Sequence, residues 1–354
     1  MYHPIPISWY FDDSIHNIEQ KCLFQSSLQY MGHELMIPKL NDYLVLERTN
    51  RSEFLIHAKQ SNQVISNICR HHQALLLQGK GNTPKIICPL HHWMYNTDGK
   101  MTHSPLFEGT LCMDLHSQKT SSWNGLIFKG TDSPHIKNPK SKIQTSLDFS
   151  NYAFSHSMSQ SYPINWKIFM EVFIDNYHVP FIHPGLRSFV DWKNQSWEIE
   201  TGYSAQFVGI QENWVKKSIN QYHNYAQLLA EYLEGELPPI GALWFAYYPN
   251  LMIEHYPQMH VISTIIPINA TNCINYIDFF HPIEVLESYP QLAQAAQIAY
   301  LSTAEEDKKI ALLMHEGRKE LFHQGVNESG PFHPLMEAGL PSFYSFLNDK
   351  ITAT

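Results

Sequence analysis

Residues 69–99 read CRHHQALLLQGKGNTPKIICPLHHWMYNTDG, and this stretch governs the interpretation of the first half of the chain. Cys69 and His71 are separated by one residue, Cys88 and His91 by two, and sixteen residues lie between the pairs. Each pair offers two metal ligands from one tight loop, and the turn-forming residues of GKGNTP separate the two loops. The spacing therefore predicts a centre that binds metal through two thiolates and two imidazoles.

Two kinds of metal centre use this ligand set. A zinc ion takes all four ligands on one tetrahedral centre, whereas a Rieske [2Fe–2S] cluster takes both cysteines on one iron and both histidines on the other. The cluster is favoured because the surrounding sequence is rich in short β patterns and departs from the His-x3–5-His spacing of zinc fingers. CRH…CPLHHWMY resembles the Rieske motif CxH…CxxH, which selects His71 and His91 over the adjacent His72 and His92.

Residues 165–186 read NWKIFMEVFIDNYHVPFIHPGL and contain a second set of candidate ligands. The spacing predicts a helix from Asn165 to about His178, on which Asp175 and His178 share a face. His183 follows five residues later, and Pro180 is expected to break the helix so that both imidazoles can face one ion. Two histidines and one carboxylate with open positions form the facial triad of non-haem Fe(II) oxygenases.

This second segment resembles the motif NWKxxxEN…DxYHxxxxH of the Rieske non-haem iron aromatic-ring-hydroxylating oxygenase α subunits. YHVPFIHPGL and YYPNLMIEHYP are most similar to the choline and glycine-betaine monooxygenase branch. By this resemblance, His178 and His183 bind a mononuclear Fe(II). Asp175 is then the catalytic residue that bridges a cluster histidine and an iron histidine of neighbouring subunits.

The resemblance also implies that the third iron ligand is an acid of the segment AEEDKKIALLMHEG. We choose Asp307 and keep Glu306 as the fallback, although acids at a helix N-terminus are also stabilised by the helix dipole alone. Val172 stands where the family often has Asn, and His315 stands where it often has Gln. These departures leave the ligand set intact but weaken the transfer of substrate knowledge.

The order of patterns predicts an α+β protein. Short β pieces at 42–130 form a small all-β Rieske domain, and the polar stretch 131–162 is a linker. Residues 163–354 form a larger antiparallel-sheet-and-helix catalytic domain with the mononuclear iron site, onto which residues 1–41 pack. In this domain LWFAYYPNLMIEHYP, HVISTIIPIN and CINYIDFFHP read as strands, and the stretch that ends at residue 322 reads as one long or two consecutive helices.

The composition argues against several classes of binding partner and location. A net charge of −9 over 354 residues argues against nucleic acid or an anionic membrane, and no apolar run approaches the roughly 20 residues that cross a bilayer. The first residues lack the pattern of a signal peptide. Five cysteines are too few for a disulfide scaffold and favour the reducing cytoplasm.

The resemblance implies an oxidoreductase, a mono- or dioxygenase that uses O2 and two electrons to oxidise a small organic substrate. A dinucleotide fingerprint is not evident, so we expect a separate NAD(P)H-dependent reductase or ferredoxin to supply the electrons. The family's head-to-tail homotrimer is expected, because it brings the cluster of one chain to the iron of the next. A non-catalytic Rieske electron carrier and a zinc-stabilised binding protein are the competing hypotheses.

The first substrate hypothesis is a quaternary ammonium compound. Five aromatic residues in the predicted strands could form a box that binds a cation through cation–π attraction; they are Trp244, Phe245, Tyr247, Tyr248 and Tyr256. Glu254 could attract the same cation if it faces the pocket. The same aromatics suit a flat ring, as in an aromatic-ring dihydroxylating dioxygenase, or an ordinary strand core.

Overall fold

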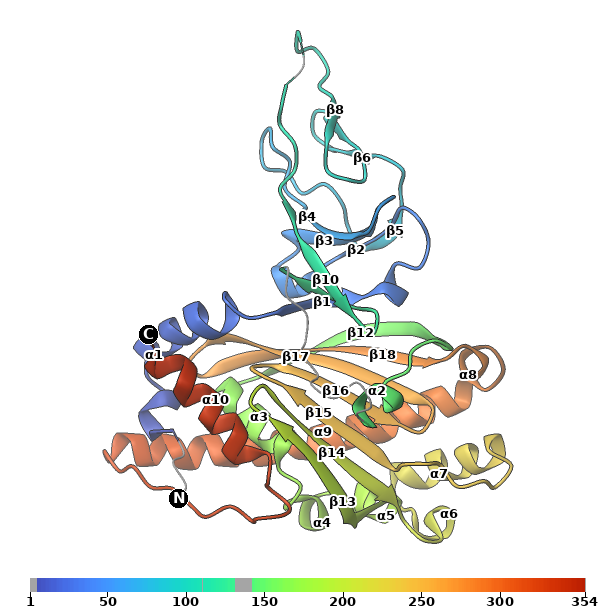
Figure 1. Ribbon diagram of the computed structural model, residues 1–354, viewed down its shortest axis with the longest axis vertical. Helices are drawn as coiled ribbons and strands as arrows, with labels where there is room; N and C mark the ends of the chain where they lie inside the picture. Colours follow the sequence, from blue (N-terminus) through green and yellow to red (C-terminus); the bar gives the residue numbers. More distant parts are fainter. Residues whose placement is uncertain (1–4, 110, 131–141, 354) are drawn as a thin grey trace. The chain divides into compact units, whose positions relative to one another are not determined.

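The computed structural model describes residues 5–109, 111–130 and 142–353, which belong to two compact units (Figure 1). Unit 1 comprises Met1–Ser27 and Pro139–Thr354, and unit 2 comprises Leu28–Asn138. The predicted N-terminal segment 1–41 is therefore divided between the units. Its second part joins unit 2 because strand β1 (Gln29–His33) pairs with β11 (Leu126–Lys129).

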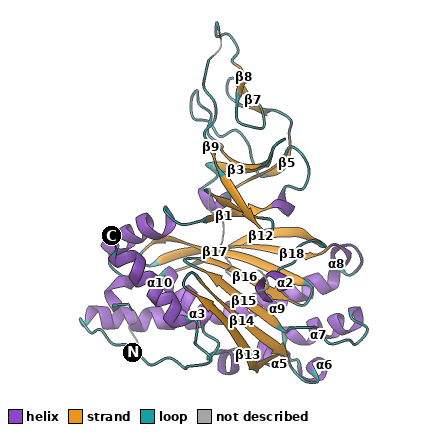
Figure 2. Cartoon of the chain, in the orientation of Figure 1, coloured by secondary structure: helices purple, strands orange, loops and turns teal. Residues whose placement is uncertain are grey.

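Unit 2 consists of short strands and long loops, and its described residues contain no α-helix (Figure 2). They form a three-stranded sheet of order β1-β11-β10, a five-stranded sheet of order β5-β2-β3-β4-β9 and a three-stranded sheet of order β6-β7-β8. The strands not yet bounded are β2 (Asp42–Val45), β3 (Glu53–His57), β4 (Asn62–Ser66), β5 (Lys80–Asn82), β6 (Ile86–Ile87), β7 (Met94–Tyr95), β8 (Met101–His103), β9 (Ser117–Gln118) and β10 (Thr120–Trp123). The small all-β domain of the prediction is confirmed.

Unit 1 is built on a seven-stranded antiparallel sheet of order β12-β18-β17-β16-β15-β14-β13. The strands are β12 (Tyr152–Tyr162), β13 (Val190–Glu200), β14 (Tyr203–Ile210), β15 (Ala242–Tyr247), β16 (Leu251–Tyr256), β17 (Met259–Asn269) and β18 (Asn272–Pro282). The three segments that read as strands in the sequence form β15 to β18. This sheet, together with the helices below, confirms the predicted α+β class.

The predicted linker 131–162 overlaps regular structure. Residues 131–141 lie outside the described residues, but Lys142–Ser146 form helix α2 and Tyr152–Tyr162 form the edge strand β12. The alternation of this strand is hard to recognise in the sequence YAFSHSMSQSY, because serine and histidine occupy its exposed positions. Pairing with β18 over the whole strand supplies the backbone hydrogen bonds that the composition does not predict.

Helices cover one face of the seven-stranded sheet. The main covering helices, labelled in Figure 1, are α3 (Trp166–Ile174), α7 (Gln221–Tyr232) and the 34-residue α9 (Pro290–His323). The sequence prediction of one or two helices up to residue 322 thus resolves to one long helix, preceded by the short α8 (Ile283–Ser288). The remaining helices are α1 (Asp13–Glu19), α4 (Val179–Ile182), α5 (Pro184–Phe189), α6 (Trp214–Lys217) and α10 (Leu340–Thr352).

Strand alternation decides which side chains this face presents. In β15 and β16 the even-numbered residues point toward the helices, and the register places Trp244 opposite Glu254 and Met252 opposite Ser263 of β17. Most residues of this face are apolar and pack into two buried clusters with α3, α7 and α9. The few polar residues on it are therefore the ones that need a functional explanation.

The N-terminal residues of unit 1 are held by buried charges. Glu19 at the end of α1 accepts hydrogen bonds from Trp166 Nε1 at 2.9 Å and from Lys167 Nζ at 2.5 Å. The Lys167 and Glu19 side chains are 0% and 1% exposed. Tyr10 donates to Glu171, which also pairs with Arg318 of α9. These bonds fix the first turn of α3 and thereby the position of the residues that follow it.

Candidate metal centres

Helix α3 ends earlier than the sequence predicts. Its last residue is Ile174, and Asp175 is extended (φ −75°, ψ 124°), so Asp175 and His178 do not share a helix face. The Asp175 carboxylate instead accepts the backbone N–H of Tyr177 at 2.5 Å, which turns the chain. Through this turn, Asp175 Oδ2 still lies 3.0 Å from His178 Nδ1.

Pro180 does not separate the two histidines as predicted. It lies in the first turn of α4, where a missing N–H is tolerated, and His178 is the residue that precedes this helix. The break falls at His183, whose backbone leaves the helical region (φ −108°, ψ 77°) before Pro184 starts α5. His178 and His183 therefore occupy the two ends of one short helix, and their Nε2 atoms lie 3.0 Å apart.

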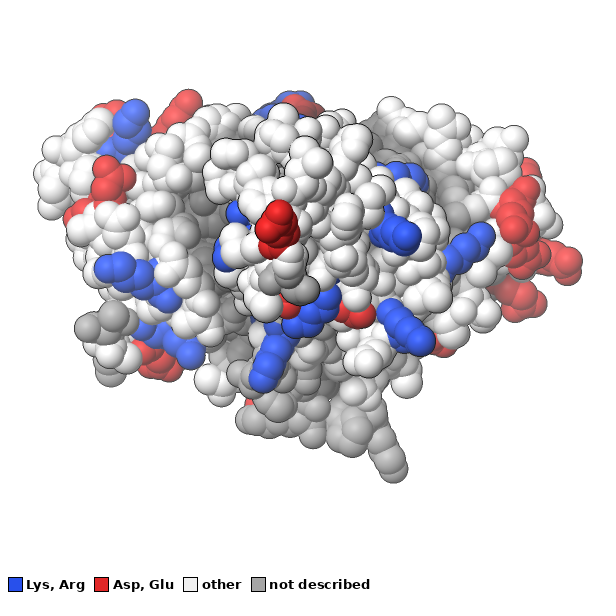
Figure 3. All heavy atoms as spheres, turned by 90° about the horizontal axis from the view of Figure 1, so that it is seen from above, with Lys and Arg blue, Asp and Glu red and all other residues white. Residues whose placement is uncertain are grey.

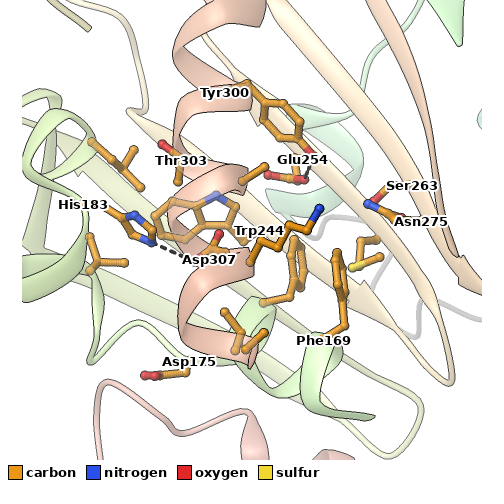
Figure 4. Close-up of a pocket in the computed structure, with 18 of the residues that line it drawn as sticks. Phe169, Asp175, His183, Trp244, Glu254, Ser263, Asn275, Tyr300, Thr303 and Asp307 are labelled. Atoms are coloured by element: carbon orange, nitrogen blue, oxygen red, sulfur yellow. Dashed lines mark hydrogen bonds and ion pairs between the residues drawn. The ribbon is translucent and has the colours of Figure 1, made fainter. Parts of the chain in front are cut away.

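The structure brings His178, His183 and Asp307 together, and one ligand atom from each lies within 4.8 Å of the others. Asp307 Oδ1 is 3.2 Å from His178 Nε2 and 2.9 Å from His183 Nε2, and Figure 4 shows the contact with His183. This oxygen is buried, yet it accepts no hydrogen bond of good geometry. Two imidazoles and a carboxylate that converge without completing hydrogen bonds suit a divalent metal ion.

The outer ring nitrogens are also engaged. Asp175 contacts His178 Nδ1, and Glu306 Oε2 lies 2.8 Å from His183 Nδ1. Glu306, the fallback for the third ligand, is thus placed behind His183 rather than in the triad. A carboxylate on the far nitrogen fixes the ring and directs Nε2 toward the metal position.

The carboxylates control the charge of the imidazoles. Burial lowers the pKa of His178, but Asp175 and Asp307 outweigh burial and raise it to about 10. The pKa of His183 shifts upward for the same reasons, with burial opposed by Asp307 and Glu306. Burial raises the pKa of Asp307, and the two histidines reverse this and hold it well below the ordinary value. Such a negative site attracts a cation, which takes the place of the protons on the imidazoles.

A cavity of about 80 Å³ lies beside the triad, between the sheet face and α3 and α9. Of the five aromatics predicted for a cation box, Trp244 and Tyr256 line it, whereas Phe245 packs against Tyr203 and Tyr248 against Phe343. Tyr247 does not line it either. The face of β15 that points away from α9 carries Phe245 and Tyr247, because alternate residues point to opposite sides.

Sequence reasoning missed two pocket residues on α9. Tyr300 and Thr303 line the cavity with Asp307, at the i, i+3 and i+7 spacing of one helix face. That spacing could have identified them once Asp307 was chosen as a ligand. Val172 and Phe169 of α3 close the cavity from the other side, so the residue that replaces the family's Asn is an apolar wall.

The four candidate cluster ligands lie in unit 2, where Cys69 is close to Cys88 and His71 is close to His91. Cys69 and Cys88 are each 1% exposed, whereas His91 is exposed and His71 half-buried. The His71 and His91 rings are 4.8 Å apart between centroids. Each cysteine starts a tight loop, closed by the hydrogen bonds Gln73 N–H to Cys69 O and, in the second loop, His92 N–H to Cys88 O.

The surroundings fit a cluster with thiolates inside and imidazoles outside. Trp93 stacks on His71, with 4.5 Å between ring centroids and a 2° interplanar angle. His71 Nδ1 is buried without a hydrogen-bond partner in the described residues, as expected for an atom that binds metal. Tyr95 approaches Cys69 Sγ at 3.5 Å. Burial raises the pKa of Cys88, and metal binding would favour its thiolate form.

Two family models account for most of the chain. The Rieske [2Fe-2S] domain matches residues 8–114, and the ring hydroxylating alpha subunit (catalytic domain) matches residues 148–353. Putrescine 2-hydroxylase from Ralstonia nicotianae is 36% identical over 97% of this chain and 94% of its own length. Choline monooxygenase from Beta vulgaris is 21% identical over 98% of this chain and 76% of its own.

Solved structures share the fold. The quaternary ammonium Rieske monooxygenase CntA in complex with L-carnitine gives a TM-score of 0.76 at 16% identity, over 99% of this chain and 95% of that chain. Naphthalene 1,2-dioxygenase from Rhodococcus sp. gives 0.70 at 17% identity, over 99% and 94%. The described residues contain no helix long and apolar enough to span a membrane. One family accounts for the order of the two domains, the buried cysteines and the triad. This chain belongs to the Rieske non-haem iron oxygenases, the ring-hydroxylating α-subunit family of oxidoreductases.

Proposed function

We propose that this enzyme is a monooxygenase that hydroxylates a small aliphatic amine of the chemical class of putrescine. The cavity beside the triad carries this proposal. Its volume is about 80 Å³, and its lining combines apolar side chains with the Glu254 carboxylate. A short unbranched diamine suits such a lining, because its alkyl chain can pack on the apolar side chains while an ammonium end meets the acid. Two putrescine 2-hydroxylases, 36% and 34% identical to this chain, support the same substrate class.

We assign the metal ligands from the geometry and the motifs. Cys69, His71, Cys88 and His91 would hold the [2Fe–2S] cluster, and the triad of unit 1 would hold Fe(II). When bound, the cluster supplies electrons singly and the ferrous ion activates O2. The overall reaction balances as R–H + O2 + 2 e⁻ + 2 H⁺ giving R–OH + H2O, with the electrons taken from a separate NAD(P)H-dependent reductase or ferredoxin.

The remaining parts of the sequence prediction belong to this proposal. One carboxylate oxygen of Asp175 contacts His178, and the Asp175 side chain is 22% exposed. This exposure leaves Asp175 accessible to a cluster histidine of a neighbouring chain in a head-to-tail homotrimer. The cytoplasm is the proposed compartment, because none of the five cysteines forms a disulfide. On the face shown in Figure 3, acidic and basic side chains are interspersed among uncharged ones.

The test is turnover under ¹⁸O2. The protein, loaded with iron and cluster and supplied with a reductase and NADH, is incubated with 1,4-diaminobutane, and the product is analysed by mass spectrometry. We expect one ¹⁸O atom per product, and no product from His178→Ala, whose cluster spectrum should remain intact. Hydroxylation by His178→Ala, or the absence of an oxygenated amine from the loaded wild type, would contradict the proposal.

A quaternary ammonium compound is the second candidate. Trp244 and Tyr256 line the cavity, and the face of such a ring attracts a methylated cation. Choline tested in parallel separates the candidates, because release of an aldehyde from choline without hydroxylation of the diamine would favour the second.

A further inference from the structure

We infer that Glu254, held by Tyr256 and Tyr300, is the group that binds a primary ammonium end of the substrate and so orients its carbon chain toward the triad. This inference rests on the proposed function and names the residue that selects the substrate within it. Glu254 lies on β16 at a position where strand alternation directs it to the helix-covered face. Figure 4 shows Glu254 beside Tyr300, with the Trp244 ring between Glu254 and His183 in that view.

The carboxylate is fixed in one orientation. Tyr256 donates its hydroxyl hydrogen to Glu254 Oε2 at 2.7 Å, and Tyr300 donates to Oε1 at 3.1 Å. Trp244 Nε1 donates in turn to the Tyr256 hydroxyl at 2.8 Å. A carboxylate has about four lone-pair sites, so two remain for a donor that enters the cavity. The three aromatic residues thus hold the acid in place without using up its capacity.

This acid lacks the partner that a buried charge normally requires. Glu254 is 4% exposed, and in the described part of the chain no Lys, Arg or His side chain pairs with it. Buried ionised groups are otherwise paired with a counter-ion, because desolvation is strongly unfavourable. A bound ammonium group with three N–H donors would supply both the charge and the missing hydrogen bonds, which a quaternary ammonium group cannot do.

Among the described residues, Lys308 is the one lysine or arginine that lines the same cavity, and its ammonium group contacts an aromatic ring rather than Glu254. Its Nζ lies 5.3 Å from the centroid of the Tyr162 ring, a cation–π distance. Lys308 is four residues beyond Ala304 on the α9 face that also carries Tyr300. Because Asp307 and Tyr300 lie on that face too, a chain anchored at Glu254 has its other end directed along α9 to the metal position.

The experiment measures equilibrium binding of 1,4-diaminobutane to the iron-loaded, cluster-loaded protein by calorimetry, in parallel with turnover. Glu254→Gln keeps the shape and removes the charge, and we expect it to raise the Kd about 100-fold, the effect of breaking a buried charged hydrogen bond. The matched control Glu212→Gln removes an exposed acid outside the cavity and should leave the Kd unchanged. The neutral probe 1-pentanol should bind wild type and Glu254→Gln equally.

A second variant covers damage to the cavity. Glu254→Asp retains the charge but shortens the side chain, so the inference requires it to bind the diamine more tightly than Glu254→Gln does. If shape alone matters, the order reverses, and the inference is overturned. It is also overturned if Glu254→Gln binds the diamine within threefold of wild type while wild type still hydroxylates it, a result that leaves the proposed function standing. If wild type neither binds nor hydroxylates the diamine, the result refutes the proposed function and therefore also the inference that rests on it.

Discussion

Replacing Glu306 by glutamine should weaken Fe(II) binding at the triad about tenfold and leave the cluster unchanged. Glu306 Oε2 lies 2.8 Å from His183 Nδ1, and the two side chains are 30% and 1% exposed. A hydrogen bond to a charged group contributes about 1.5–3 kcal/mol, and partial exposure of this carboxylate places its bond at the low end. Since 1.4 kcal/mol corresponds to a factor of ten, the glutamine variant loses about one order of magnitude.

The assay starts from protein that holds the cluster but no iron at the triad. This protein is titrated with Fe(II) against a competing chelator while the visible spectrum of the cluster is recorded. Glu306→Ala removes the acceptor altogether and should approach the roughly 100-fold loss typical of a residue that supports a metal ligand. Glu305→Gln is the control, because Glu305 precedes it on the same helix and is exposed. Equal Fe(II) affinities for wild type and both Glu306 variants would refute the reasoning that this carboxylate orients His183.

Three further outcomes follow from the same contacts. At saturating Fe(II), Asp175→Asn should carry both metals yet slow turnover about 10–100-fold, and a wild-type rate in rapid mixing would exclude a role in electron transfer. Lys167→Met should lower the free energy of unfolding by about 3–5 kcal/mol, because Glu19 is left buried and charged. Urea denaturation measures this free energy. The double variant with Glu19→Gln should recover part of the loss. Burial raises the pKa of Glu254 to about 7, a shift that its tyrosine donors oppose and Asp307 reinforces. An alkyl amine stays protonated at pH 6–8, so the Kd of 1,4-diaminobutane should fall about tenfold as the carboxyl ionises over this interval, and a flat profile would show that ionisation of Glu254 does not control binding.

The local motifs could be predicted from the sequence because each one encodes a complete loop. Cys69-x-His71 and Cys88-x-x-His91 each combine a candidate ligand pair with a turn within a few residues, and the structure brings the two cysteines together and the two histidines together. The strands β15 to β18 were equally readable, because short apolar runs rich in β-branched and aromatic residues are typical of strands buried on both faces. In contrast, β12 escaped recognition because an edge strand with serine at the solvent positions resembles a loop in composition.

The path of the chain between Asp175 and His183 shows where local reasoning fails. Helical spacing over 165–178 correctly identified which residues meet, but for a wrong geometric reason, since the helix stops at Ile174 and the contact arises through a turn. The stop depends on the Asp175 side chain, which offers its own oxygen to the Tyr177 backbone in competition with the helix. Such competition is decided by tertiary packing, so the sequence pattern alone does not reveal it.

Glu254 illustrates why a specificity residue is harder to find than a ligand. A single acid between Ile253 and His255 has no motif, and in most strands it would face water. The burial and orientation of this acid become evident only when β16 is paired with β15 and covered by α9. Its two hydrogen-bond donors are the nearby Tyr256 and Tyr300, which lies 46 positions along the chain. An acid that the fold buries, orients and leaves without a cation has a large unfavourable desolvation free energy. A cationic substrate that relieves this free energy on entering gains affinity that a neutral molecule of the same size does not, so the buried charge itself selects the substrate.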